Sequence, residues 1–171
     1  MSARCDSGCV LIRDDRPEDE AAIAIVVRRA FGREDEAKLV EMLRADGDAA
    51  ISLVALAGDQ VAGHVMFSRM SAPFRALGLA PLSVSPEYQG RGVGRSLVEE
   101  GLKRAAGKGW QGVFVLGDAG YYERFGFRGA LAAGFESPYA GPHLMAFALN
   151  RDLPMRVGQI AYPRAFQALG L

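Results

Sequence analysis

A glycine-rich segment, residues 82–95 (LSVSPEYQGRGVGR), has the composition of an anion-binding turn. Its glycines, Gly90, Gly92 and Gly94, follow a predicted strand and lead directly into a predicted helix. Glycine lets the backbone adopt positive φ and approach a ligand closely, and the first N–H groups of a helix have no partner inside the helix. These groups lie at the positive end of the helix dipole and suit a phosphate or pyrophosphate. Arg91 and Arg95 add positive charge.

Two common phosphate-binding motifs do not fit this segment. A P-loop requires Gly-Lys-Ser/Thr, which the segment lacks. A dinucleotide-binding turn requires glycine at its first, third and sixth positions, and the sixth position counted from Gly90 is Arg95. The glycines alone also leave open a strand-to-helix turn that binds no ligand.

A second segment with chemical potential is Tyr121–Phe127 (YYERFGF). A phenol has a pKa of about 10, so it stays protonated at neutral pH and can donate a proton. The spacing of Tyr121 and Tyr122 alone favours aromatic packing on a short helix. Gly126 and Phe127 suit a turn and a buried aromatic residue. Proton donation and packing both remain open at this point.

Alternating strands and helices are expected to position these segments. Apolar runs predict strands at residues 9–14, 51–57, 60–70, 76–85, 112–117 and 143–149. Helical spacing predicts helices at residues 17–31, 35–45, 92–106 and 121–125. Pro81 cannot donate to a sheet ladder, so it predicts an edge or a bulge in its strand. The order of these elements predicts an α/β protein with a mixed, mostly antiparallel sheet and helices on both faces.

The composition is that of a globular protein of one domain. The chain has 171 residues, of which 50% are hydrophobic, and its 20 basic residues balance 20 acidic ones. This balance argues against nucleic acid as a main partner. No apolar run approaches the roughly 20 residues of a membrane span, and the first residues lack the apolar core of a secretory signal. We therefore expect a cytoplasmic protein with no membrane partner.

Residues that bind metals are scarce in the sequence. Cys5 and Cys9 lie near the N-terminus, and His64 and His143 are the two histidines. A structural zinc site usually needs four such ligands at set spacings. We expect two free thiols and no metal. His64 lies in an apolar run and is expected to be a hydrogen-bonded core residue.

The two segments together resemble the signature of the GCN5-related N-acetyltransferase (GNAT) superfamily. Val84–Gly94 (VSPEYQGRGVG) is similar to its Gln/Arg-x-x-Gly-x-Gly/Ala motif after a strand, and Tyr122–Phe127 is similar to Tyr-x-x-x-Gly-Phe. The resemblance implies a GNAT domain over residues 10–150, in which the central strands at 76–85 and 112–117 splay apart. Residues 151–171 are expected to form a C-terminal extension that packs on this core or on a partner subunit.

The resemblance implies acetyl-CoA as cosubstrate and no metal. Backbone amides of residues 90–95 are implied to hold its pyrophosphate, and the preceding strand is implied to pair with its pantetheine arm. The implied cofactor-binding residues are Leu82, Ser83, Val84, Gln89, Gly90, Arg91, Gly92, Val93, Gly94 and Arg95.

The resemblance also assigns catalytic roles. Tyr122 is the implied donor of a proton to the leaving thiolate, and the amide of Val84 is the implied donor to the developing oxyanion. Many members of the family carry an asparagine shortly before the tyrosine motif. Asp118 stands in that region here, which shifts the expected contact with the cofactor arm to Asp118 or to backbone. No base stands out among the polar residues expected near the slot, which are Glu87, Asp118, His64 and Ser83.

The implied function is an N-acetyltransferase that moves an acetyl group to a primary amine by direct attack in a ternary complex. The alternative is an acetyl-CoA-binding sensor or interaction module without turnover. The acceptor is a small-molecule or peptide amine, selected by the first two helices and by loops near residues 31–36 and 135–143. The apolar residues of the extension suit packing on the domain, a homodimer contact or a cap on the acceptor pocket; they are Ile160, Tyr162, Phe166 and Leu169.

Overall fold

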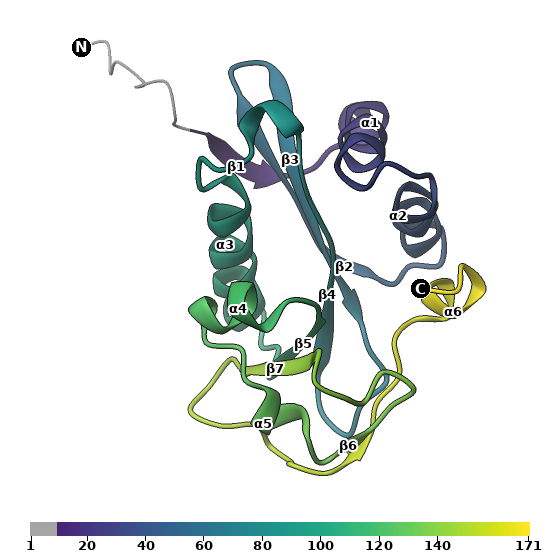
Figure 1. The fold of residues 1–171 in the computed structure, drawn as a ribbon, viewed down its shortest axis with the longest axis vertical. Coiled ribbons are helices and arrows are strands. Elements are labelled where there is room, and N and C mark those ends of the chain that lie inside the picture. Colours follow the sequence, from purple (N-terminus) through teal and green to yellow (C-terminus); the bar gives the residue numbers. More distant parts are fainter. Residues whose placement is uncertain (1–9) are drawn as a thin grey trace.

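A six-stranded sheet forms the centre of the molecule, with helices on both faces (Figure 1). The computed structural model describes residues 10–171, so Cys5 and Cys9 lie outside it. The sheet consists of β1 (Leu11–Asp14), β2 (Ala49–Ala57), β3 (Gln60–Arg69), β4 (Ala76–Val84), β5 (Gly112–Leu116) and β7 (Leu144–Ala148). Its order is β1-β2-β3-β4-β5-β7, and only the pair β4–β5 is parallel. The predicted mixed, mostly antiparallel α/β sheet is confirmed.

Three long helices cover the two faces of the sheet. Helices α1 (Glu20–Phe31) and α2 (Asp35–Ala45) lie on one face, and α3 (Val93–Gly107) lies on the other (Figure 1). Because successive side chains of a strand point to opposite faces, Met66 joins the cluster under α1 and α2, while Phe67 joins the cluster under α3. Both residues are fully buried. The helices predicted at residues 17–31, 35–45 and 92–106 are thus confirmed to within a few residues.

The remaining elements are short. They are η1 (Pro17–Asp19), η2 (Pro86–Tyr88), α4 (Ala119–Tyr122), η3 (Glu123–Phe125), α5 (Gly129–Ala132), β6 (Phe135–Glu136), β8 (Gly158–Gln159) and α6 (Arg164–Ala168). Strands β6 and β8 form a separate two-stranded parallel sheet. The sequence patterns did not predict α5, β6, β8 or α6.

Strand β4 carries the bulge that Pro81 predicts. Phe67 pairs with Leu79 and Val65 pairs with Leu82. One residue of β3 therefore lies between these two pairs, whereas two residues of β4 do. Such an extra residue bends a strand and changes the direction in which the following backbone groups point. The bulge therefore separates the part of β4 that pairs on both sides from the part that ends at the glycine turn.

Strands β4 and β5 separate part-way along their length. They pair at Ala76–Gly112, Leu77–Val113 and Gly78–Phe114, and the pairing ends there in the described chain. Beyond Gly78, β4 continues to Val84 with its edge toward β5 unpaired. The expected splay of the central strands is confirmed, and it opens the sheet next to the glycine turn.

The C-terminal segment lies against α2. Ala165 and Phe166 of α6 are buried in the same cluster as Leu39 and Leu43 of α2. Figure 1 shows α6 beside α2, on the side of the sheet opposite α3. Within residues 10–171, no helix combines the length and the apolar composition needed to cross a bilayer.

Candidate active site

The glycine turn presents free N–H groups at the start of α3. Gly90 and Gly92 have φ values of 75° and 80°, in the left-handed region that favours glycine. The N–H of Ser96 is the first to bond back into the helix, to the carbonyl oxygen of Gly92 at 3.0 Å. The N–H groups of the three preceding residues, Val93 to Arg95, have no partner inside the helix. These three residues line an open groove of about 550 Å³.

Most of the predicted cofactor-binding residues line this groove. Its walls include Leu82, Val84 and the run Gln89–Arg95 except Arg91. The guanidinium of Arg91 instead lies 5.7 Å from the centre of the Tyr88 ring. Ser83 is buried and does not line the groove. Gln89 has a structural contact as well, because its side-chain amide donates to the carbonyl oxygen of Val84 at 3.0 Å.

The backbone of β4 alternates between its two edges. The N–H of Ser85 donates to the carbonyl oxygen of Ala62 on the β3 side at 2.8 Å. In an antiparallel pair, hydrogen-bonded and non-hydrogen-bonded positions alternate. The N–H and C=O of Ser83 therefore point toward β3, whereas those of Leu82 and Val84 point toward the open edge. The C=O of Val84 already accepts a hydrogen bond from the side chain of Gln89. The N–H of Val84 therefore remains unpaired at the open edge of β4, where β4 and β5 have separated.

Five residues that line the groove were not predicted to bind the cofactor, namely Ala30, Phe31, Tyr88, Tyr121 and Arg124. Of these, Tyr121 and Arg124 come from the tyrosine motif, and the Arg124 guanidinium lies 4.8 Å from the centre of the Tyr121 ring. A Cβ atom at Gly94 would lie 2.9 Å from the hydroxyl of Tyr121, so this glycine makes room for the phenol. Arg124 belongs to the tyrosine motif, which is distant in sequence from the glycine turn. The folded chain brings both to the same groove.

Tyr122 lies on the other side of the same helical turn. Its ring packs at 5.8 Å from Phe127 and at 5.0 Å from Tyr121, both edge-on. Gly117 supplies the space, because a Cβ there would lie 2.8 Å from the Tyr122 ring. Burial, with a smaller contribution from Tyr121, raises the pKa of Tyr122 to about 12. The phenol is therefore protonated at neutral pH.

A second cavity, of about 370 Å³, begins where the groove ends. Phe31 and Leu82 line both spaces, and Tyr122 and Asp118 line only the second cavity. The second cavity extends along Leu79–Leu82, where β4 and β5 have separated, and α6 closes its far side. Adjacent tyrosines thus face different spaces, Tyr121 the groove and Tyr122 the second cavity.

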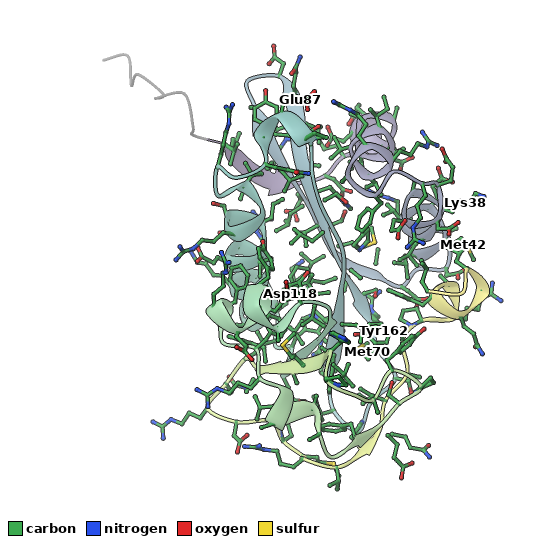
Figure 2. All side chains as sticks on the ribbon, viewed as in Figure 1. Lys38, Met42, Met70, Glu87, Asp118 and Tyr162 are labelled. Carbon is green, nitrogen blue, oxygen red and sulfur yellow. The ribbon has the colours of Figure 1, made fainter. Side chains whose placement is uncertain are left out.

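Of the four polar residues considered as a base, only Asp118 lines the second cavity. Its Oδ1 accepts from the N–H of Gly120 at 2.8 Å and caps α4. Glu87 is bound to Arg29 of α1 at 2.6 Å, and this contact lowers the pKa of the Glu87 carboxyl. Figure 2 shows Glu87 on η2 near α1 and Asp118 beside α4. The buried hydroxyl of Ser83 has no hydrogen-bond partner among residues 10–171.

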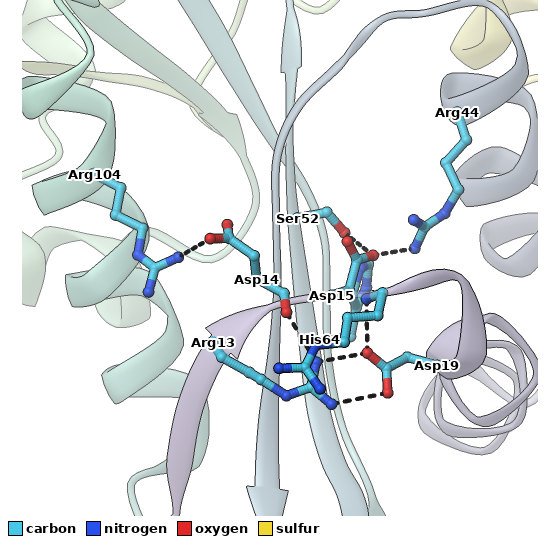
Figure 3. Close-up of polar contacts among 9 residues, drawn as sticks. Arg13, Asp14, Asp15, Asp19, Arg44, Ser52, His64 and Arg104 are labelled. Atoms are coloured by element: carbon cyan, nitrogen blue, oxygen red, sulfur yellow. Dashed lines mark hydrogen bonds and ion pairs between the residues drawn. The ribbon is translucent and has the colours of Figure 1, made fainter.

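His64 is a core residue, as expected, and not part of the slot. Its Nε2 lies 2.8 Å from the hydroxyl of Ser52, which donates to Asp15 at 2.6 Å, and Asp15 pairs with Arg44 (Figure 3). Because the Ser52 proton goes to Asp15, His64 donates from Nε2. Burial, with a smaller contribution from the charge of Arg44, lowers the pKa of His64 to about 3. In the described chain, no three side chains of the types that bind metals gather at one point.

Comparisons with known proteins agree with this arrangement. Residues 48–129 match the description "Acetyltransferase (GNAT) domain". The chain is 43% identical over 122 residues to the uncharacterized N-acetyltransferase YhbS of Escherichia coli, a match that covers 69% of this chain and 73% of YhbS. It is 42% identical over 133 residues to the uncharacterized N-acetyltransferase YjhQ of the same organism, covering 72% and 73% of the two chains.

Two crystal structures of similar proteins contain the cofactor. The complex of Escherichia coli YhbS with CoA superposes with a TM-score of 0.89 at 34% identity, over 97% of this chain and 96% of that one. A GNAT acetyltransferase from Brucella melitensis in complex with acetyl-CoA gives a TM-score of 0.80 at 36% identity, over 93% and 99%. The glycine turn before α3, the splayed strands and these relatives together lead to one conclusion: the chain belongs to the GNAT family of acetyltransferases.

Proposed function

We propose that the protein is an acetyl-CoA-dependent N-acetyltransferase that acetylates a primary amine by direct attack in a ternary complex. The observation that carries this proposal is the junction at Phe31 and Leu82. These two residues line both the groove over the glycine turn and the second cavity, and Tyr122 lines the second cavity. One space suits the cofactor, and the other suits the amine.

The residues of the groove fit acetyl-CoA. The free N–H groups of Val93, Gly94 and Arg95 suit a diphosphate, and each hydrogen bond to a charged group contributes about 1.5–3 kcal/mol. The unpaired edge of β4 at Leu82 and Val84 suits the amides of the pantetheine arm. We add Tyr121 and Arg124 to the predicted cofactor site because they line the groove, whereas Ser83 and Arg91 do not line it.

Bound acetyl-CoA supplies a thioester whose carbonyl carbon receives the amine. The N–H of Val84 donates to the carbonyl oxygen as negative charge develops on it. Tyr122 holds a proton on its hydroxyl oxygen and donates it to sulfur as the C–S bond breaks and the C–N bond forms. The nitrogen gives up one proton as it becomes an amide, and this proton restores the hydroxyl of Tyr122. The amine must first lose a proton, which costs about 4.6 kcal/mol at pH 7 for a pKa of about 10.4.

The alternative function is a sensor that binds acetyl-CoA without turnover. A sensor would also use the groove, but it would not need Tyr122 or the second cavity. Titration calorimetry with CoA, followed by thiol release from acetyl-CoA with a panel of amines, separates the two. We expect heat on addition of CoA and thiol release with at least one amine. CoA binding without thiol release for any amine would favour the sensor, and no heat at all would refute both.

A further inference from the structure

The second cavity has a lining with a definite chemical character. Five aromatic side chains surround it, namely those of Phe31, Tyr122, Tyr139, Tyr162 and Phe166. Most of the other lining residues are aliphatic. This composition suits an acceptor with an apolar body, and the volume of about 370 Å³ lies within the usual range for small-molecule sites.

The ionisable residues of the lining are all acidic or phenolic. Its carboxylates belong to Glu36 and Asp118, and no lysine, arginine or histidine of the described chain lines the cavity. Burial raises the pKa values of Tyr122 and Tyr162, so both phenols are neutral. A ligand ammonium group therefore meets a carboxylate and aromatic faces, which stabilise a cation. A ligand carboxylate meets no cation.

The two carboxylates are not equally available. Glu36 is 5% exposed and already ion-paired with Arg33. Asp118 is exposed and lines the cavity, and its Oδ1 accepts one hydrogen bond, from the N–H of Gly120. One carboxylate thus remains without a cationic partner in the lining. Asp118 can thus pair with one positive charge, and a second ammonium group on the ligand finds no further unpaired side-chain carboxylate in this lining.

Tyr162 sets the size of the cavity. Its ring contacts Tyr139 at 5.5 Å and Phe166 at 4.9 Å between ring centres. A Cβ at Gly78 would lie 2.7 Å from this ring, so the ring sits tightly against β4. The hydroxyl oxygen of Tyr162 is buried and has no hydrogen-bond partner in residues 10–171, so the part of the residue that faces the cavity is ring surface. Figure 2 shows Tyr162 between β4 and α6.

We infer that the acceptor is a small primary monoamine with an apolar alkyl or aryl body and no carboxylate, held by Asp118 at its ammonium group and limited in length by Tyr162. This inference rests on the proposed function and specifies its substrate class. It disfavours amino acids, whose carboxylate has no cationic partner in the lining, and polyamines, which carry a second ammonium group.

Matched pairs of amines test the inference with the full-length protein. Phenylethylamine and phenylalanine differ by one carboxylate, and hexylamine and hexanediamine differ by one terminal ammonium. We expect kcat/KM to be at least about 30-fold higher for the first member of each pair. The carboxylate of phenylalanine would lie beside the like charge of Asp118, and the second ammonium group of hexanediamine would lie in the apolar part of the cavity without a free carboxylate. Binding of each amine to the CoA-saturated protein, measured by calorimetry, should follow the same order.

Three variants test the assigned residues. Asp118→Asn keeps the cap on α4 but removes the charge, and we expect about a 5-fold lower kcat/KM for phenylethylamine with the affinity for CoA unchanged. Glu41→Gln, on the exposed side of α2 outside this lining, is the control and should change neither value. Tyr162→Ala lengthens the cavity and should raise the ratio of kcat/KM for octylamine over hexylamine by at least about 10-fold. Tyr162→Phe keeps the ring and should leave that ratio unchanged.

The outcomes distinguish a failure of the inferred substrate class from a failure of the proposed N-acetyltransferase function. A preference for phenylalanine or hexanediamine, or turnover of peptide or protein amines only, overturns the inference and leaves the acetyltransferase function in place. An unchanged ratio in a folded Tyr162→Ala variant overturns the role of Tyr162. CoA binding without thiol release for any amine overturns the proposed function, and the inference with it.

Discussion

Two adjacent tyrosines on one helical turn face two different spaces, the groove and the second cavity. Tyr121 faces the groove over the glycine turn, where Gly94 leaves room for its hydroxyl, and Tyr122 faces the second cavity, where Gly117 leaves room for its ring. Neighbouring residues of a helix point in directions about 100° apart, so a tyrosine pair can serve two sites. Tyr122, the proposed proton donor, is the tyrosine whose pKa burial raises to about 12.

Tyr122→Phe tests the proton donor. We expect kcat to fall about 100-fold, because the thiolate then leaves without a positioned acid, while the affinity for CoA changes little. Since burial raises the pKa of Tyr122 to about 12, the wild-type rate should not decline through loss of this proton below about pH 10. Steady-state rates across pH, with calorimetry of CoA binding, provide the measurement. Unchanged turnover in the variant would assign Tyr122 to packing only.

His64 gives a prediction about stability and pH. Its pKa is about 3 in the folded chain, against 6.5 for an unperturbed histidine, so between these values the unfolded chain binds the extra proton. The free energy of unfolding should therefore fall as pH decreases through this window, with a contribution of about 1.4 kcal/mol per pH unit. Above pH 6.5 the contribution is fully present.

Urea denaturation at several pH values checks this expectation. His64→Leu should show a flatter decline than the wild type, whereas His143→Gln, which changes an exposed histidine, should keep the wild-type slope. Parallel curves for the wild type and His64→Leu would show that the chain of contacts through Ser52 and Asp15 is not coupled to protonation of this histidine.

At the scale of secondary structure, α3 combines two demands. Its first residues must present free N–H groups to a ligand, and its middle must lie close to the sheet. Gly101 meets the second demand, because a Cβ there would lie 2.2 Å from the Phe67 ring. The glycines before the helix meet the first demand through positive φ. Glycine therefore allows close packing in the middle of α3 and allows positive φ in the turn before it.

Two alanine substitutions in this element should have opposite effects. Gly92→Ala puts a side chain at φ 80°, and we expect the free energy of unfolding to drop by about 1–2 kcal/mol. Gly107→Ala, at the last residue of α3 with open space around it, should raise it by about 0.4–1 kcal/mol. Chemical denaturation of both variants is the measurement. Equal effects would mean that the left-handed conformation at Gly92 is not maintained in solution.

The elements that the sequence predicted are those with a long apolar period. The sheet strands, the three long helices and the bulge at Pro81 all follow from local patterns, and so does the glycine turn. Elements α5, β6, β8 and α6 have two to five residues each, too few to show a period, and they are held by tertiary contacts.

The same limit applies to the site. The glycine turn and Tyr122 were predicted because each belongs to a compact motif. Arg124 was not assigned to the site, because no local spacing relates its side chain to the glycine turn. Tyr139 lies in the loop that was expected to select the acceptor, and Tyr162 is one of the residues considered as a cap on the acceptor pocket, but the sequence alone did not show that both line the same cavity. Ser83 was expected at the groove because sequence alone does not show which edge of β4 each residue faces.

For the molecule as a whole, the C-terminal segment completes one of the two ligand spaces. Tyr162, Phe166 and Leu171 line the second cavity, and none of them lines the groove over the glycine turn. Tyr139 donates a hydrogen bond to the carbonyl oxygen of Leu171, which links the segment to the loop after β6. The residues beyond the predicted boundary at residue 150 therefore line the proposed acceptor cavity but not the proposed cofactor groove.

Phe166→Ala tests this division. Phe166 is 7% exposed, so the truncation should lower the free energy of unfolding by about 3–5 kcal/mol. In the folded fraction we expect a higher KM for the amine and an unchanged Kd for CoA. Denaturation, calorimetry and steady-state kinetics measure the three quantities. A weaker affinity for CoA with an unchanged KM would contradict the division.

The splay of β4 and β5 also bears on how this protein avoids self-association. An uncovered strand edge ordinarily invites a foreign chain to join the sheet and is a source of aggregation. Here the bare edge of β4 lies between two strands of its own sheet, so an intruding polypeptide would have to push β5 aside to reach it. A thin, amide-bearing chain such as pantetheine meets no such barrier. The same geometry that leaves an edge for the proposed pantetheine arm should therefore limit pairing with another protein chain.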